Sequence, residues 1–173
     1  MTQCAIANHS HKIYVWVRPF GTHQRGFMSR QRTPSDSFSD TITALAAPAQ
    51  VDQLGPVAGR FLHALRLIAL HDRLGRDPVP ELAEKLGSVD VAAKALILAQ
   101  AIGASWPEDI AVSRFCCRLM SHDEVTIGAF VDAAARGDRA GFEAALSGLI
   151  RADRTHRLWE SALALAAAEL RSL

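Results

Sequence analysis

Cysteines, aromatic residues and long apolar runs are scarce in this chain of 173 residues. Aromatic residues make up 6% of it, and the three cysteines, Cys4, Cys116 and Cys117, are too few for the disulfide framework of a small secreted protein. No apolar run reaches the roughly 20 residues of a membrane-spanning helix, and the N-terminus has neither the apolar core nor the cleavage site of a signal peptide. The sequence therefore predicts a cytoplasmic protein without a membrane partner.

Motifs of common enzymes are missing as well. There is no glycine-rich phosphate loop after a strand, no GxSxG, no HExxH and no paired-carboxylate signature. We therefore expect no catalytic residue and no cofactor, and the prediction is that the protein is not an enzyme.

Charge is nearly balanced, with a formal net charge of +1. Residues 1–35 carry only basic charges, whereas residues 51–173 carry fourteen basic and sixteen acidic side chains. A nearly neutral body lacks the electrostatic footprint of a nucleic-acid-binding domain. The charge pattern therefore argues against nucleic acid as a partner.

Alanine and leucine dominate the hydrophobic residues, which make up 49% of the chain. Both residues favour helices over strands, so we predict an all-α fold, a compact bundle of five to seven short helices formed by residues 51–173 as a single domain. Residues 1–50 include Gly21, Gly26, Pro34 and the polar stretch 35–40, and we predict a flexible, basic N-terminal extension there. Met28 is an alternative start, which would leave residues 1–27 upstream of the native protein.

Capping residues and apolar spacing divide the domain into helices. The predicted segments are 56–71, a short helix from Asp77 to Gly87, 89–102 ended by Gly103, 122–136, a helix capped by Asp138, and 153–171. Ser121 and Glu124 have the spacing of a capping box, and Val125 follows on the predicted buried face. Residues 110–120 fit either a short helix or an extended stretch.

The helix over 89–102 is apolar nearly all round. We expect this helix near the centre of the bundle, with Asp90 and Lys94 paired on its one solvent-exposed edge.

Residues 81–96 (ELAEKLGSVDVAAKAL) resemble the helix-turn-helix of bacterial regulators, with Ala83 and Gly87 at the usual spacing. The second helix would, however, offer Val89, Val91 and alanines instead of the side chains that read base edges. Two core helices joined by a tight turn are the preferred interpretation, and DNA binding is the third functional hypothesis.

The run RFCCRLMSHDE, residues 114–124, is the most chemically suggestive segment. Cys116, Cys117 and His122 supply thiols and an imidazole that could hold a metal ion. Adjacent cysteines rarely point at one ion, however, and no CxxC pair is present, so the alternative is that both are buried core residues. The run holds five other candidate residues. Arg114 and Arg118 could make a thiol more reactive. Met120 offers a thioether, and Asp123 and Glu124 offer carboxylates.

Two segments together resemble an uncharacterised bacterial family of small helical proteins, a domain of unknown function. The first is GPVAGRFLHALRLIALH, residues 55–71, and the second is VSRFCCRLMSHDE, residues 112–124, with its Cys-Cys-x-x-Met run before an acidic helix start. That family tends to carry three cysteines and an Arg-Met pair, whereas here there are two and Leu119 separates Arg118 from Met120. The resemblance implies a bacterial, cytoplasmic protein and brings no activity or cofactor with it.

The leading functional hypothesis is a non-enzymatic helical module that binds another protein or a second copy of itself. An interface would be marked by apolar residues that project outward from the last helix, with Leu163, Leu165, Ala167 and Leu170 as the candidates. The alternative is a thiol-based metal or redox sensor that uses Cys116, Cys117 and His122.

Overall fold

Helices follow one another along residues 48–172, the part of the chain that this computed structural model describes. They are the 3₁₀ helix η1 (Val51–Gln53) and the α-helices α2 (Pro56–Leu74), α3 (Val79–Leu86), α4 (Val89–Ser105), α5 (His122–Ala135), α6 (Arg139–Leu146) and α7 (Ala152–Arg171). No strand occurs within these residues, so the predicted all-α bundle of five to seven short helices is confirmed. The predicted extension over residues 1–50 lies almost wholly outside the described residues.

Three predicted helix starts are confirmed by their capping contacts. The Ser88 hydroxyl accepts a hydrogen bond from the Val91 amide (3.4 Å) at the start of α4, and the Asp138 carboxylate accepts one from the Gly141 amide (2.8 Å) at the start of α6. Ser121 begins α5 with a complete capping box. Each side chain satisfies an amide that the first turn leaves without a backbone partner.

Several predicted boundaries were wrong. Helix α4 runs through Gly103 to Ser105, because the stronger stop is Pro107, which disfavours helical backbone at the preceding Trp106. Helix α2 continues past residue 71 to Leu74, where Gly75 adopts a left-handed conformation (φ 62°) and ends it. The predicted cap of α3, by contrast, is confirmed: the Asp77 carboxylate accepts from the Val79 amide (3.0 Å), and the helical hydrogen bonds begin at the following Pro78.

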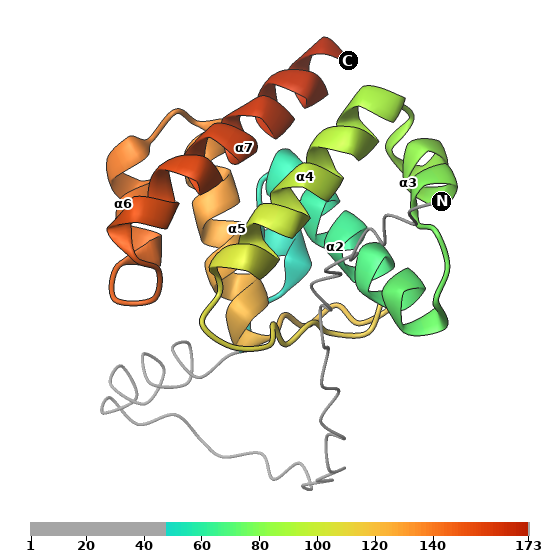
Figure 1. The fold of residues 1–173 in the computed structure, drawn as a ribbon, viewed down its shortest axis with the longest axis horizontal. Coiled ribbons are helices and arrows are strands. Elements are labelled where there is room, and N and C mark those ends of the chain that lie inside the picture. The colour runs from blue at the N-terminus through green and yellow to red at the C-terminus, as the bar shows by residue number, and fades with distance from the viewer. Residues whose placement is uncertain (1–47, 173) are drawn as a thin grey trace, which may run out of the picture.

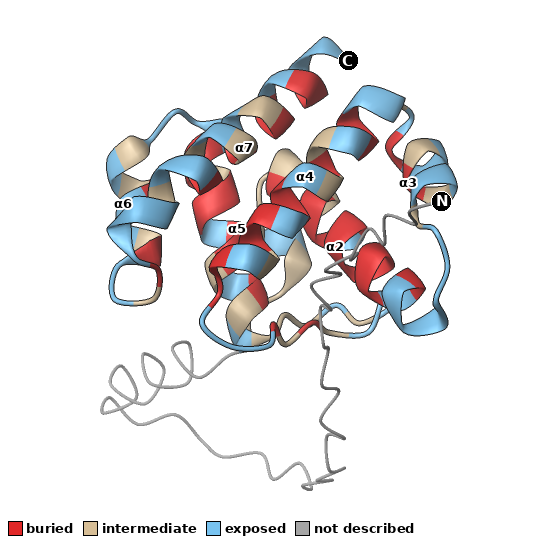
Figure 2. Cartoon of the chain, viewed as in Figure 1, coloured by how far each residue is buried: buried red, intermediate tan, exposed pale blue. Residues whose placement is uncertain are grey.

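The bundle is built around α2, which contacts α3, α4 and α5 (Figure 1). Helix α7 packs along α4 and also against α5, and α6 closes the far side against α5 and α7. Figure 2 shows the buried residues on the surfaces that these helices turn toward one another. Helix α4 contacts α2, α3 and α7, which agrees with the expectation that it lies near the centre of the bundle, although one stripe of it is exposed.

Aromatic side chains join the last three helices. The rings of Phe130 and Phe142 have centroids 5.3 Å apart, and those of Phe142 and Trp159 are 5.0 Å apart, both in edge-to-face contact. Such pairs stabilise beyond the area that they bury. Val125, predicted to be buried, is 37% exposed instead, because its neighbour Glu124, which is fully buried, takes the inward-facing position at the start of α5.

None of the helices in the described residues combines the length and apolar character needed to cross a membrane.

Candidate functional site

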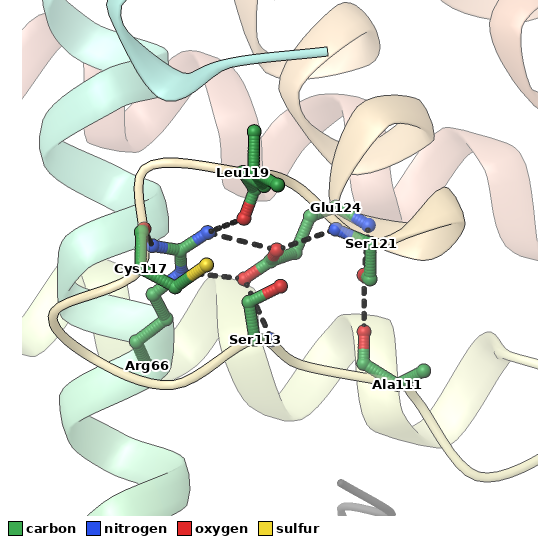
Figure 3. A network of polar contacts seen from close by, with 7 residues as sticks. All are labelled: Arg66, Ala111, Ser113, Cys117, Leu119, Ser121 and Glu124. Carbon is green, nitrogen blue, oxygen red and sulfur yellow. Dashed lines mark hydrogen bonds and ion pairs between the residues drawn. The ribbon is translucent and has the colours of Figure 1, made fainter. Parts of the chain in front are cut away.

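A buried ion pair holds the long connection between α4 and α5. Arg66 of α2 and Glu124 of α5 have fully buried side chains, with Nε 2.6 Å from Oε1 and Nη2 2.9 Å from Oε2 (Figure 3). This two-point contact matches the planar guanidinium to the carboxylate. Because a buried charge is costly without a partner, each residue depends on the other.

The same two side chains also bind the backbone of the connection. Arg66 donates to the carbonyls of Cys117 and Leu119, the latter at 3.1 Å, and Glu124 accepts from the amides of Ser113 (3.2 Å) and Ser121 (2.8 Å). Six residues from three segments therefore form one polar network, visible in Figure 3. The network fixes the course of a connection that has no helix of its own.

Asp123 fastens the earlier half of the connection. Its carboxylate accepts from the Trp106 indole nitrogen (3.3 Å) and from the Ala111 amide (2.7 Å), and the Ser121 hydroxyl donates to the Ala111 carbonyl. Asp123 and Glu124, both candidate ligands from the sequence, are thus occupied in holding the backbone. Residues 110–120 are correspondingly not helical, which answers the question left open by the sequence.

The start of the described chain lies along the far end of the connection. The Val51 amide donates to the Arg118 carbonyl (3.0 Å), and the Met120 amide donates to the Ala49 carbonyl (2.9 Å). Arg118 also pairs on the surface with Asp52 at 2.8 Å. Arg118 and Met120 therefore join two distant segments, and residues 49–50 belong to the helical body.

Between these anchors the chain makes an exposed turn over Arg114–Cys117, which we call the thiol turn. The Cys117 amide donates to the Arg114 carbonyl (2.9 Å), so that Phe115 and Cys116 occupy the two central positions. Cys116 is exposed and Cys117 half-buried. The expectation of buried core cysteines was wrong, because the turn stands outside the bundle. The Phe115 ring rests edge-on against His63 of α2, 6.0 Å between centroids.

The predicted metal ligands do not come together as a set. Within residues 48–172, no group of three or more His, Cys, Asp or Glu side chains is placed to hold a metal ion. His122 is exposed at the first position of α5, while Asp123 and Glu124 face the connection. The sequence hypothesis of a site made from Cys116, Cys117 and His122 thus receives no geometric support.

A second feature is an apolar surface on the helix pair α4 and α7. Arg171 pairs with Asp90 (3.0 Å), and Arg154 donates to the Ala104 carbonyl (3.2 Å), so the two helices run antiparallel. The two helices lie side by side on the near side of the bundle in Figure 1 and expose apolar residues as well as polar and charged ones. Six of the exposed apolar residues form what we call the α4–α7 face: Val89, Ala93, Ile97, Leu163, Ala167 and Leu170.

Part of this face was anticipated. Leu163, Ala167 and Leu170 project outward as the interface hypothesis requires, whereas Leu165 is buried. The predicted pairing of Asp90 with Lys94 is wrong, because Asp90 reaches across to Arg171.

A buried carboxylate lies between α2 and α7. Glu169 is 3.3 Å from the Arg60 guanidinium, which also donates to the Leu86 carbonyl (2.7 Å). Burial raises the pKa of the Glu169 carboxyl above its ordinary value, and the Arg60 charge only partly offsets that rise. This contact links the ends of three helices.

Arg66 is the structural residue that sequence reasoning missed. In the sequence it follows Arg60 and His63 at intervals of three, a spacing that predicts a stripe beside the apolar face of the helix. A signal was present, because Arg66 follows Leu62 by four residues and Leu62 faces the core. An arginine at such a position requires a buried acid, and Glu124 of the capping box is that acid.

No protein-family model, curated protein or solved structure matches this chain. The resemblance to a bacterial family of helical proteins therefore stays a prediction.

Proposed function

We propose that this chain is a non-enzymatic interaction module that binds a second copy of itself through the α4–α7 face. The observation that carries the proposal is the apolar character of that face: Val89 is 71% exposed, Leu170 70% and Ile97 49%. Scattered apolar residues are normal on a surface, but a contiguous group on two neighbouring helices is typical of an interface.

The spacing of these residues favours a helical partner. Val89, Ala93 and Ile97 follow one another at intervals of four, and Leu163, Ala167 and Leu170 at intervals of four and three. Such intervals place side chains in one stripe, which packs into the grooves of a facing helix. The alanine side chains of the stripe are small, so that the backbone of a second helix can approach closely.

The charges around the face favour a second copy in particular. Asp90 and Arg171 at one end already pair with each other at 3.0 Å, so closing the interface would leave neither charge unpaired. A two-fold axis would set one antiparallel helix pair on the same pair of another copy, in the manner of a four-helix bundle. A charged or nucleic-acid partner would find no complementary charge there.

DNA binding through α3 and α4 is the weaker candidate. The exposed stripe of α4, a helix described throughout, carries Val89, Asp90, Ala93, Ile97, Gln100 and Ala104 and no basic side chain. Phosphate contacts require lysine or arginine at such a surface.

A cytoplasmic, bacterial setting belongs to the same proposal. The exposed Cys116 and half-buried Cys117 are free thiols, and free thiols suit a reducing compartment. The bacterial origin rests on the family resemblance alone.

The test is the mass in solution of the full chain, measured by sedimentation or light scattering from roughly 1 to 200 µM. We expect a reversible dimer. Ile97→Glu and Leu163→Glu should each weaken it at least ten-fold, a change of about 1.4 kcal/mol, because each places an unpaired charge in the interface. Leu74→Glu is the matched control: Leu74 is 54% exposed at the end of α2, away from the face.

Helical circular dichroism of each variant establishes that it is folded. A monomer throughout the concentration range contradicts the proposal. So does a dimer that Leu74→Glu weakens as strongly as Ile97→Glu.

A further inference from the structure

Adjacent cysteines at an exposed turn are a reactive arrangement that self-association through the α4–α7 face does not use. Cys116 is exposed at a central position of the thiol turn, and Cys117 is the half-buried residue that closes it. The two thiols belong to consecutive residues, so no movement of helices is needed to bring them together.

The two residues differ in how firmly the backbone is held. The Cys117 carbonyl accepts from the buried Arg66 guanidinium, and its amide donates to the Arg114 carbonyl at 2.9 Å. The following Arg118 and Leu119 are fixed by the Val51 amide (3.0 Å) and again by Arg66 (3.1 Å). Cys116 is thus the exposed end, and Cys117 the anchored end, of one dipeptide.

We propose that Cys116 and Cys117 form a reversible dithiol–disulfide couple that exchanges with small-molecule disulfides. The exposed Cys116 thiolate attacks one sulfur of the small disulfide, whose S–S bond breaks and releases one small thiol. The Cys117 thiolate then attacks the Cys116 sulfur of the mixed disulfide and displaces the second small thiol. The protein loses two protons and two electrons, which the small disulfide takes up to become two thiols.

The product is a strained and therefore labile disulfide. Consecutive Cα atoms across a trans peptide are about 3.8 Å apart, whereas ordinary disulfides join Cα atoms about 4.4–6.8 Å apart. The peptide bonds of the described chain are all trans. Strained, exposed disulfides are the easily reduced ones that serve regulation.

Closure of the ring changes the contacts of the thiol turn. The ring includes the peptide bond between Cys116 and Cys117, that is, the carbonyl of Cys116 and the amide of Cys117. Its formation therefore reorients the amide that donates to the Arg114 carbonyl, while the Cys117 carbonyl, which Arg66 binds, lies just outside the ring. Loss of the hydrogen bond that closes the thiol turn destabilises the oxidised form, so the contacts of the turn favour the reduced pair and respond to oxidation.

The experiment uses the full chain with Cys4→Ser, so that only the pair can react. The protein is equilibrated with oxidised and reduced glutathione at a series of ratios and quenched with acid. The mass of the intact protein is then measured by mass spectrometry. We expect a species that has lost two hydrogens, carries no glutathione and returns to the dithiol with dithiothreitol. Its Tm should be lower by about 2–4 °C, and amide exchange should increase over residues 113–119.

Cys117→Ser is the decisive variant, because it keeps the carbonyl that Arg66 binds. Without a second thiol, the glutathione adduct on Cys116 should persist. Three results overturn the proposal: an adduct that accumulates on the intact pair as much as on Cys117→Ser, disulfide-linked dimers as the main product, or no reaction at either residue. None of these depends on whether the α4–α7 face associates.

Discussion

Arg66 and Glu124 lie 58 positions apart in the chain and form a two-point ion pair with no solvent exposure. Trp106, Ile110 and Val112 anchor the first half of the connection between α4 and α5 in the core, and the Arg66–Glu124 pair orders the second half, which carries the thiol turn. The thiol turn is consequently held by polar contacts, and its stability depends on two side chains from elsewhere in the sequence.

Substitution of Arg66 by methionine should lower the free energy of unfolding by about 3–5 kcal/mol, because it leaves the Glu124 carboxylate buried without its cation. Urea denaturation measures the change. The matched control is Arg118→Ala, which removes the exposed pair with Asp52 and should cost less than about 1 kcal/mol. Similar losses in both variants would show that the buried pair contributes no more than a surface contact.

Ser121→Ala should destabilise the protein by about 1–2 kcal/mol. Its hydroxyl accepts from the Glu124 amide at 3.1 Å and donates to the Ala111 carbonyl, so two backbone groups lose a partner. Ser88→Ala, which removes a longer cap of 3.4 Å at the start of α4, should cost less than about 1 kcal/mol. Thermal unfolding of both variants in one buffer ranks them, and the reverse order would contradict the role given to Ser121.

Gly128→Ala should lower stability by about 1–3 kcal/mol through overpacking. A Cβ at Gly128 would lie 2.8 Å from Cδ2 of Leu54, inside van der Waals contact. Trimming the neighbour should relieve the clash, so Leu54→Ala and Gly128→Ala should destabilise less together than the sum of their separate effects. Chemical denaturation of the two single variants and the double variant measures the three free energies of unfolding. If the losses of the single variants simply add in the double variant, contact with Leu54 is not the cause of the destabilisation.

Glu169 should make the fold less stable as the pH rises from acid toward neutral. Because burial raises its folded-state pKa above the ordinary 4.5, the folded protein holds a proton that the unfolded chain releases. The stabilisation is therefore complete below about pH 4.5 and is lost as the pH passes the raised folded value. Glu169→Gln should remove this part of the pH dependence.

Arg60→Gln provides the opposite test. Without the Arg60 charge, which lowers the pKa of Glu169, the pH dependence between acid and neutral should become steeper. Free energies of unfolding measured from pH 4 to pH 7 distinguish the two variants. Parallel curves for both variants and the parent would show that Glu169 titrates alike in the folded and unfolded states.

The helix pattern could be predicted from sequence because caps and periodicity are local. Ser88, Ser121 and Asp138 each bind an amide within three residues, and such contacts depend only on neighbouring residues. The end of α4 was misplaced for an equally local reason, since a glycine was given more weight than the following proline.

The remaining features depend on contacts between distant residues. The burial of Arg66 requires Glu124 and two carbonyls from the connection, and none of these can be assigned to it without the fold. The exposure of Cys116 has the same origin, since cysteine usually packs inside and only the course of the connection turns it outward. The apolar character of α4 was read as burial, although one stripe of it faces away from the bundle.

The backbone contacts of Ala49 and Val51 with residues 118–120 also determine how the domain would respond to a mechanical load. Tension applied through the chain that precedes Ala49 reaches these hydrogen bonds before it reaches any α-helix. A pull on the N-terminal end is therefore transmitted first to the anchored side of the thiol turn.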